Sequence, residues 1–125
     1  MKGAKYQTQW AGQYGVAHEL TRRGYLVSFT IGNAPKTDLI CTSPSGKDFS
    51  VQVKSLKSKN YFLYQESLLS VESDLYYVFV LVPEIQNNKP ILSVEYYIMN
   101  NIQFRQTVEF EKLRLKKKEE RLGKP

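Results

Sequence analysis

The chain has 125 residues, a length that suits one domain rather than two. Hydrophobic residues make up 42% of the sequence, which is typical of a folded globular protein and excludes a disordered one. The net charge is +6, and the single cysteine and single histidine exclude a disulfide framework, a cysteine-cluster zinc site and a multi-histidine metal site.

The first segment is predicted to be a helix over residues 5–23. Its apolar residues recur at helical spacing, and Gly24 follows two arginines, as glycine does at helix ends. Gln13 interrupts the apolar face. Burying an amide without a partner costs about 1–3 kcal/mol, so Gln13 requires a polar partner or a wet cavity. The predicted apolar face consists of Tyr6, Trp10, Val16, Ala17 and Leu20.

Three strands are predicted next, over residues 25–30, 37–42 and 48–54, and the last two form a hairpin across the turn 43–47. Residues 55–74 have weak periodicity, with a helical turn expected near 66–71. An apolar run at 75–82 predicts a central buried strand, residues 91–99 another strand, and 109–122 a charged, lightly packed helix.

This order predicts a single α/β domain in which helices cover a mixed sheet. We see no domain boundary within residues 1–125. The longest apolar run is far too short to cross a bilayer, and the N-terminus lacks the apolar stretch of a signal peptide. We therefore expect a cytoplasmic protein with no membrane partner.

Almost all of the net positive charge lies in residues 112–124, within a basic C-terminal helix or tail of about residues 109–125. Residues 112–124 hold seven basic and two acidic residues, which accounts for +5 of the +6 net charge. A nearly neutral body with a basic tail indicates a polyanionic partner such as nucleic acid, although a solvated helix face is an equally good explanation of a lone charge run.

Strand alternation gathers three polar side chains at one edge of the predicted sheet. Gln52 and Lys54 share one face of their strand, and antiparallel pairing can place Asp38 opposite that end. A carboxylate, an amide and an ammonium can together hold a hard cation through oxygens. Such an ion would polarise a phosphate and supply a hydroxide-like water, while the lysine stabilises the developing charge. This pattern favours phosphodiester hydrolysis.

At these residues the sequence resembles the PD-(D/E)XK nuclease superfamily, which includes restriction enzymes, Holliday-junction resolvases and intron-encoded homing endonucleases. The family pattern is an acidic residue in the first helix, an aspartate beginning a strand and (D/E)-x-K on the next strand. Asp38 matches the strand aspartate, and Gln52-Val53-Lys54 is similar to the Q-x-K of some homing endonucleases. Residues 12–25, GQYGVAHELTRRGY, resemble the resolvase first helix and put Gln13 at its acidic position.

The resemblance implies a restriction-endonuclease-like domain with an α-β-β-β-α-β core, and a metal-dependent endonuclease that hydrolyses DNA. It implies Mg²⁺ or Mn²⁺ held by Asp38, Gln52 and the Val53 carbonyl. Lys54 would serve the attacking water, and Gln13 would support the metal shell. We therefore expect Gln13 to face the other residues, and the nuclease alignment would collapse if Gln13 lay on the sheet face opposite Lys54. Asp38 is the only aligned carboxylate, so metal binding should be weak.

Other interpretations stay open. Asp38 could cap its loop, and Gln52 and Lys54 could be solvated strand residues. Glu19 is a poor substitute for a helix acid because it lies about 120° around the helix from Gln13, and it is expected to pair with a neighbouring arginine. The protein could also be an inactive nuclease-like protein that binds nucleic acid, or an interaction module. An active enzyme of this size would need a second copy to cut both strands, so a homo-oligomer is also left open.

Overall fold

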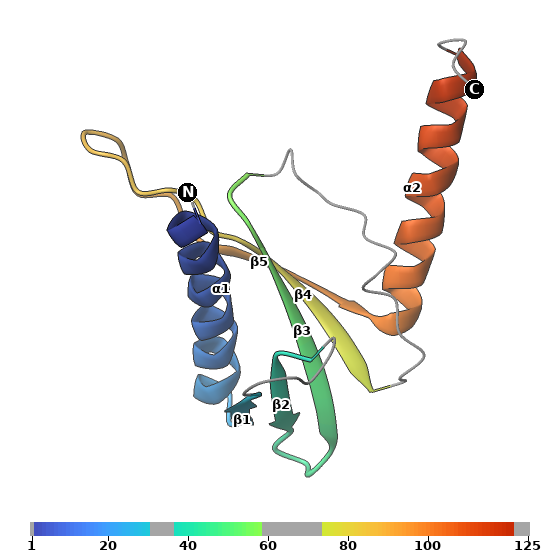
Figure 1. Cartoon of the computed structure of the whole chain (residues 1–125). Helices are drawn as coiled ribbons and strands as arrows, with labels where there is room; N and C mark the ends of the chain where they lie inside the picture. Colours follow the sequence, from blue (N-terminus) through green and yellow to red (C-terminus); the bar gives the residue numbers. More distant parts are fainter. Residues whose placement is uncertain (1, 31–36, 59–73, 122–125) are drawn as a thin grey trace.

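The computed structural model describes residues 2–30, 37–58 and 74–121 of the chain (Figure 1). In this part of the chain, two helices flank a five-stranded sheet. The α/β architecture expected from the sequence is therefore confirmed. The elements in chain order are α1 (Lys2–Arg22), β1 (Leu26–Phe29), β2 (Leu39–Thr42), β3 (Asp48–Leu56), β4 (Leu75–Leu81), β5 (Glu95–Asn100) and α2 (Asn101–Arg121).

The strands follow one another across the sheet in the order β1-β2-β3-β4-β5. Three of the four pairings are antiparallel, and only β3 and β4 run parallel. The sheet is therefore mixed and open, with β1 and β5 at its edges. Strand β4 lies between β3, with which it pairs parallel, and β5. It is buried on both faces, as the apolar run at 75–82 predicts.

One face of the sheet packs against α1. Val16 of the helix is buried against Val51, Val53 and Val78, and Leu20 packs against the same cluster. Cys41 also belongs to this cluster, with only 1% of its surface exposed. Alternation along β3 then assigns Gln52 and Lys54 to the opposite face.

The opposite face is covered by the start of α2. Phe104 and Val108 are buried against Leu75, Tyr77 and Phe79 of β4, and the rings of Tyr77 and Phe104 stack with their centroids 4.1 Å apart. Beyond these turns α2 extends away from the sheet (Figure 1). Phe110 and Leu113 in that part are exposed.

Helix α2 begins at Asn101 rather than near residue 109 as expected. The cause is a reciprocal cap at its start, in which the Asn100 side chain accepts the Gln103 N–H at 2.8 Å and the Gln103 side chain accepts the Asn100 N–H at 2.9 Å. The cap also ends β5 at Asn100. At its other end, β5 begins at Glu95 rather than at Ile91 as expected. The helical turn expected near residues 66–71 lies outside the described residues.

The α1 face also differs from the prediction at its N-terminal end. Tyr6 is exposed instead of packing in the core. Trp10 is half-buried and contacts the rings of Tyr14 and Phe29, with centroids 5.3 and 6.0 Å away, respectively. The aromatic residues of α1 therefore turn toward β1, and smaller and polar residues of the helix face the sheet.

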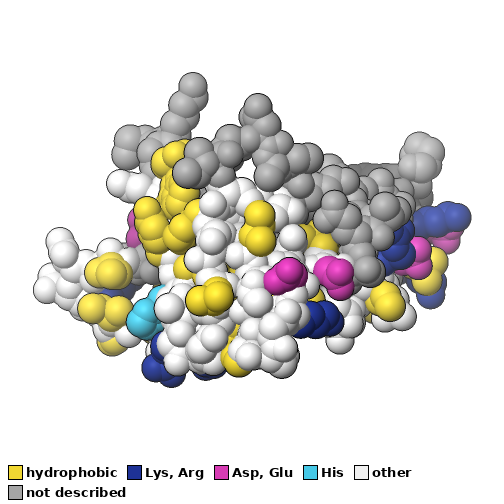
Figure 2. All heavy atoms as spheres, turned by 90° about the horizontal axis from the view of Figure 1, so that it is seen from below, with side chains coloured by type: hydrophobic (Ala, Val, Ile, Leu, Met, Phe, Trp, Pro, Cys, Tyr) yellow, Lys and Arg dark blue, Asp and Glu magenta, His cyan; other side chains and the backbone are white. Residues whose placement is uncertain are grey.

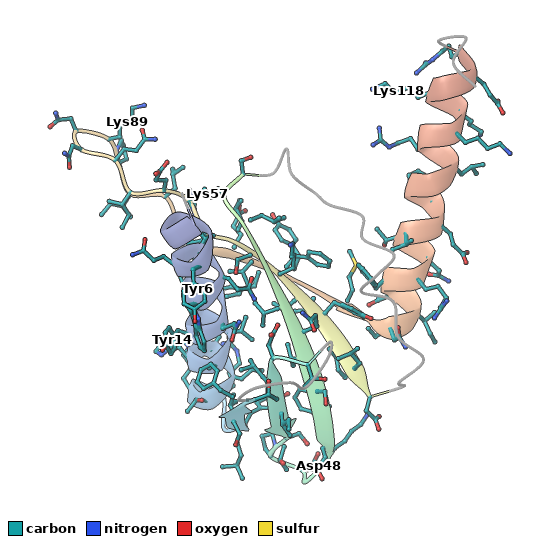
Figure 3. All side chains as sticks on the ribbon, in the orientation of Figure 1. Tyr6, Tyr14, Asp48, Lys57, Lys89 and Lys118 are labelled. Carbon is teal, nitrogen blue, oxygen red and sulfur yellow. The ribbon has the colours of Figure 1, made fainter. Side chains whose placement is uncertain are left out.

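Residues 83–94, between β4 and β5, project from the sheet as an arm near the N-terminus of α1 (Figure 1). Lys89 lies at the outer end of the arm (Figure 3). Asn88, next to it, has a positive φ of 63°, which asparagine tolerates in turns. In the described residues, no helix combines the length and apolar character that a membrane-crossing helix needs.

Candidate functional site

Strands β2 and β3 pair from Thr42 and Asp48, next to the hairpin turn, to Leu39 and Val51. At Asp38, just before Leu39, they separate, and we call this point the fork. The Asp38 N–H still donates to the Val51 carbonyl at 2.8 Å. Two positions further along β3, the Asp38 carboxylate accepts the Val53 N–H at 2.8 Å. Beyond the fork, the Asp38 side chain thus accepts the β3 hydrogen bond that a β2 carbonyl would otherwise accept. Asp38 is held at the fork by its backbone N–H and by its carboxylate.

Gln9 of α1 continues this pattern along the exposed edge of β3. Its amide nitrogen donates to the Val53 carbonyl at 2.9 Å, and its amide oxygen accepts the Ser55 N–H at 3.3 Å. The helix comes this close because Gly12 has no side chain, and a Cβ there would lie 1.9 Å from the Ser55 Oγ. The result is a continuous hydrogen-bonded chain from Asp38 through Val53 to Gln9.

Asp38, Gln52 and Lys54 lie along one face at the fork. The β2–β3 register, extended by one residue, sets Asp38 opposite Gln52, and alternation sets Lys54 next on the same face. The Gln52 Oε1 atom is buried and accepts no hydrogen bond from the described residues. A buried carbonyl oxygen without a donor is unfavourable, and a cation or a water would satisfy it.

One residue implied by the family resemblance, Gln13, is placed differently from the expectation, and another, Val53, already has a hydrogen-bond partner at its carbonyl. Gln13 is 8% exposed and belongs to α1, which covers the face of Val51 and Val53. Gln13 and Lys54 are therefore on opposite faces of the sheet. The expectation that Gln13 faces the other residues is wrong, and the alignment with the family fails at the first helix. The Val53 carbonyl, expected to bind metal, already accepts the Gln9 amide.

Gln9 is the residue of this site that sequence analysis missed. It lies one helical turn before Gln13, so helical spacing assigns both amides to the sheet-facing side of α1. The neighbouring Gly12 was the signal available in the sequence, because a glycine inside a helix often marks close approach of another backbone. The distinction between Gln9 and Gln13 depends on where along α1 the helix crosses β3.

The electrostatics of the fork depend on Asp38. Burial raises the pKa of its carboxyl group above the ordinary value, and the Val53 N–H offsets part of that rise. The described residues contain no group of three or more His, Cys, Asp or Glu side chains that could hold a metal ion. Glu19 does not supply a further ligand, because it pairs with Arg22 at 3.1 Å and with Arg23, and Arg23 is the main cause of its lowered pKa.

The oxygens of Asp38 and Gln52 fit a divalent ion only in part. Mg²⁺ is often held by one or two carboxylates together with waters and substrate phosphates, and one carboxylate with one amide oxygen meets that minimum. A tight site made of protein ligands alone would need more charge. The donor set therefore suits a weakly bound ion that a phosphate completes.

Exposed cations lie beyond the fork. Lys57 is at the far end of β3, and Lys118 is near the free end of α2 (Figure 3). Lys and Arg side chains gather at the end of the molecule formed by α2 (Figure 2). The exposed basic residues of α2 are Arg105, Arg114, Lys116, Lys117, Lys118 and Arg121.

Comparison with known proteins identified no family: no protein-family model, no curated protein and no solved structure matches the chain.

Proposed function

We propose that the protein is a metal-dependent nuclease that hydrolyses phosphodiester bonds of DNA at the fork. The observation that carries this proposal is the Gln52 oxygen, which is buried and has no hydrogen-bond partner among the described residues. Gln52 is at the register position opposite Asp38 and on the same face of β3 as Lys54. The order and spacing of these three residues, which resemble the PD-(D/E)XK pattern, support it.

Asp38 and Gln52 would hold Mg²⁺ or Mn²⁺, which supplies polarisation of the phosphate and activation of water. Lys54 stabilises the negative charge that develops on the phosphate oxygens. Gln9 is a positioning residue, because its amide holds the backbone groups of Val53 and Ser55 on either side of Lys54. Gln13 takes no part in this mechanism.

The raised pKa of Asp38 links metal binding to pH. A proton and a cation compete for the same carboxylate, and burial without a cation favours the proton. Ion affinity should therefore rise with pH through the titration of Asp38. The exposed basic side chains of α2 would contribute contacts to the DNA backbone that do not depend on base sequence.

The test is a calorimetric titration with Mg²⁺ and with Mn²⁺, alongside cleavage of a plasmid. Asp38→Asn should remove metal binding and cleavage together. Lys54→Ala should leave metal binding intact and lower cleavage by about 10²-fold or more. Gln52→Glu, which adds a negative ligand, should tighten metal binding.

Matched controls come from the same strand. Asp48 lies at the end of β3 opposite Lys57 and bonds the Thr42 hydroxyl, so Asp48→Asn should change neither readout (Figure 3). Lys57→Ala controls for the loss of a lysine. Wild-type protein that binds no divalent ion and cuts no DNA would refute the enzyme proposal.

A second function is favoured by the bond between Gln9 and the Val53 carbonyl. That bond occupies one of the two lone pairs of the Val53 carbonyl, in a site that has a single aligned carboxylate. An inactive nuclease-like protein that binds nucleic acid would fit this arrangement. It is distinguished by salt-sensitive DNA binding without cleavage in Mg²⁺ or Mn²⁺.

A further inference from the structure

Exposed apolar side chains are concentrated along one edge of the molecule. This edge consists of β5, the arm before it and the first turn of α2. Ile98 in the middle of β5 is 66% exposed, and Ile85 and Ile91 of the arm are each 73% exposed. The exposed large hydrophobic residues of this edge are Ile85, Ile91, Leu92, Val94, Tyr97, Ile98 and Ile102.

The backbone of β5 is open on the same side. In the described part of the sheet, β4 is its single strand neighbour, so about half of its N–H and C=O groups point away from the sheet. Edge strands are usually protected by lysine, proline or a short length. Residues 91–102 contain neither lysine nor proline, and Glu95 is their single charged residue.

The apolar surface continues from this edge onto the α1 side of the sheet. A half-open cavity of about 440 Å³ lies there, between α1 and the strands. Tyr96 and Ile98 of β5 line it, together with Phe49, Tyr76 and Val78. A partner aligned with β5 would therefore meet apolar surface beside the open strand as well as along it.

We propose that β5 pairs with β5 of a second copy in antiparallel orientation, so that the two sheets join across a two-fold axis. A strand paired antiparallel with itself makes the self-complementary contact that such an axis requires. Directly opposed residues must share a face, and a register centred on Ile98 meets this condition. This inference is independent of the proposed nuclease function.

The sequence of the edge fits self-pairing in that register. Ile98 lies opposite Ile98 of the second copy and Tyr97 opposite Met99, and Glu95 falls beyond the residues that pair within β5. Apolar residues thus meet apolar residues at the centre of the register, and no charge opposes a like charge.

The first test is the oligomeric state of the full chain, by light scattering after size-exclusion chromatography over a range of micromolar concentrations. The expected mass is twice the 14.5 kDa of the chain. Ile98→Asp places like charges at the centre of the interface and should weaken the dimer at least tenfold. Leu26→Asp is the matched control, because Leu26 is 73% exposed on the other edge strand, β1, and should leave the dimer intact.

The second test does not depend on whether Ile98→Asp folds. Cβ atoms of directly opposed residues lie about 4.5–5.5 Å apart, so Ile98→Cys should form a disulfide-linked dimer on mild oxidation. The native Cys41 is buried and does not interfere. Leu26→Cys should not cross-link. A monomeric wild-type protein, or a dimer that Ile98→Cys does not link, would overturn the proposal.

Discussion

The two helices have the same length of 21 residues but are held to the sheet in different ways. Helix α1 contacts the sheet from Gln9 to Leu20, through hydrogen bonds to β3 and through buried Val16. Among the α2 side chains that the structure describes, Phe104 and Val108 are the buried ones, and the later turns carry exposed cations. Helix α1 therefore positions the site, whereas much of α2 carries charge and contributes little to the stability of the fold.

The sharpest test of this difference lies within α2. Phe104→Ala should lower the unfolding free energy by about 3–5 kcal/mol, because Phe104 fills the cluster with Tyr77 and Phe79. Phe110→Ala is the control in the same helix, and a change of at most about 0.5 kcal/mol is expected at this exposed site. Urea denaturation measures both. Equal losses would mean that α2 is held along its whole length.

The close approach of α1 gives the next largest effect. Gly12→Ala would place a Cβ 1.9 Å from the Ser55 Oγ and 3.1 Å from the Ser55 Cβ. The helix must then shift, and we expect a net loss of about 1–2 kcal/mol after the gain in helix propensity.

Gly15→Ala is the matched control for this substitution. There the nearest atom is the Tyr96 hydroxyl oxygen, at the end of a side chain that can move aside. Thermal unfolding of the two variants should therefore separate them, with Gly12→Ala the less stable. The opposite order would contradict the tight contact at Ser55.

A smaller effect is expected at Asp38, with a defined dependence on pH. Burial raises the pKa of Asp38 above its ordinary value of 3.8, so the folded state binds the proton more tightly than the unfolded state does. The free energy of unfolding therefore falls as the pH rises from 3.8 through the pKa of the folded state. Asp38→Asn has no charge to bury and should be more stable than wild type at pH 7 by up to about 1 kcal/mol.

The advantage of Asp38→Asn should disappear near pH 3.8 and below, where Asp38 is protonated in both states. Denaturation in a chelating buffer at several pH values measures this, and Asp48→Asn serves as control. If Asp38→Asn were less stable at pH 7, the Val53 hydrogen bond would outweigh the burial of charge.

Removal of residues 112–125 should have the smallest effect on folding, within about 0.5 kcal/mol. It should nevertheless flatten the salt dependence of DNA binding. The log–log slope should fall by roughly 0.9 for each DNA phosphate that the shortened protein no longer neutralises. Fluorescence anisotropy over a salt series measures the slope. An unchanged slope would show that the charged helix end is only solvated.

Much of the fold was predictable from local patterns. Alternation in residues 48–54 and the apolar run at 75–82 predicted β3 and β4, because a strand repeats every two residues and a buried strand is apolar throughout. The start of α2 was missed although the Asn100 and Gln103 signal was present. There, the apolar residues around the cap resemble a continuing strand.

The candidate site was predictable only where strand alternation determines the geometry. Gln52 and Lys54 share a face of β3, as alternation requires, and the register extended by one residue sets Asp38 opposite Gln52. The position of α1 along β3 depends on tertiary packing at Gly12 and Ser55, and no pattern within the helix distinguishes Gln9 from Gln13. A side chain such as Gln9, whose partners are backbone groups of a distant strand, is not marked by any local sequence pattern.

The burial of Cys41 has a practical consequence for following the opening of the molecule in real time. Burial raises the pKa of its thiol to about 11, so at pH 8 about one thiol in a thousand is ionised. A thiol-specific reagent can react with Cys41 only when β2 and its neighbours part, because the side chain lies in the central cluster. Cys41 is therefore a native labelling site, and the rate at which its thiol reacts reports how often the core opens.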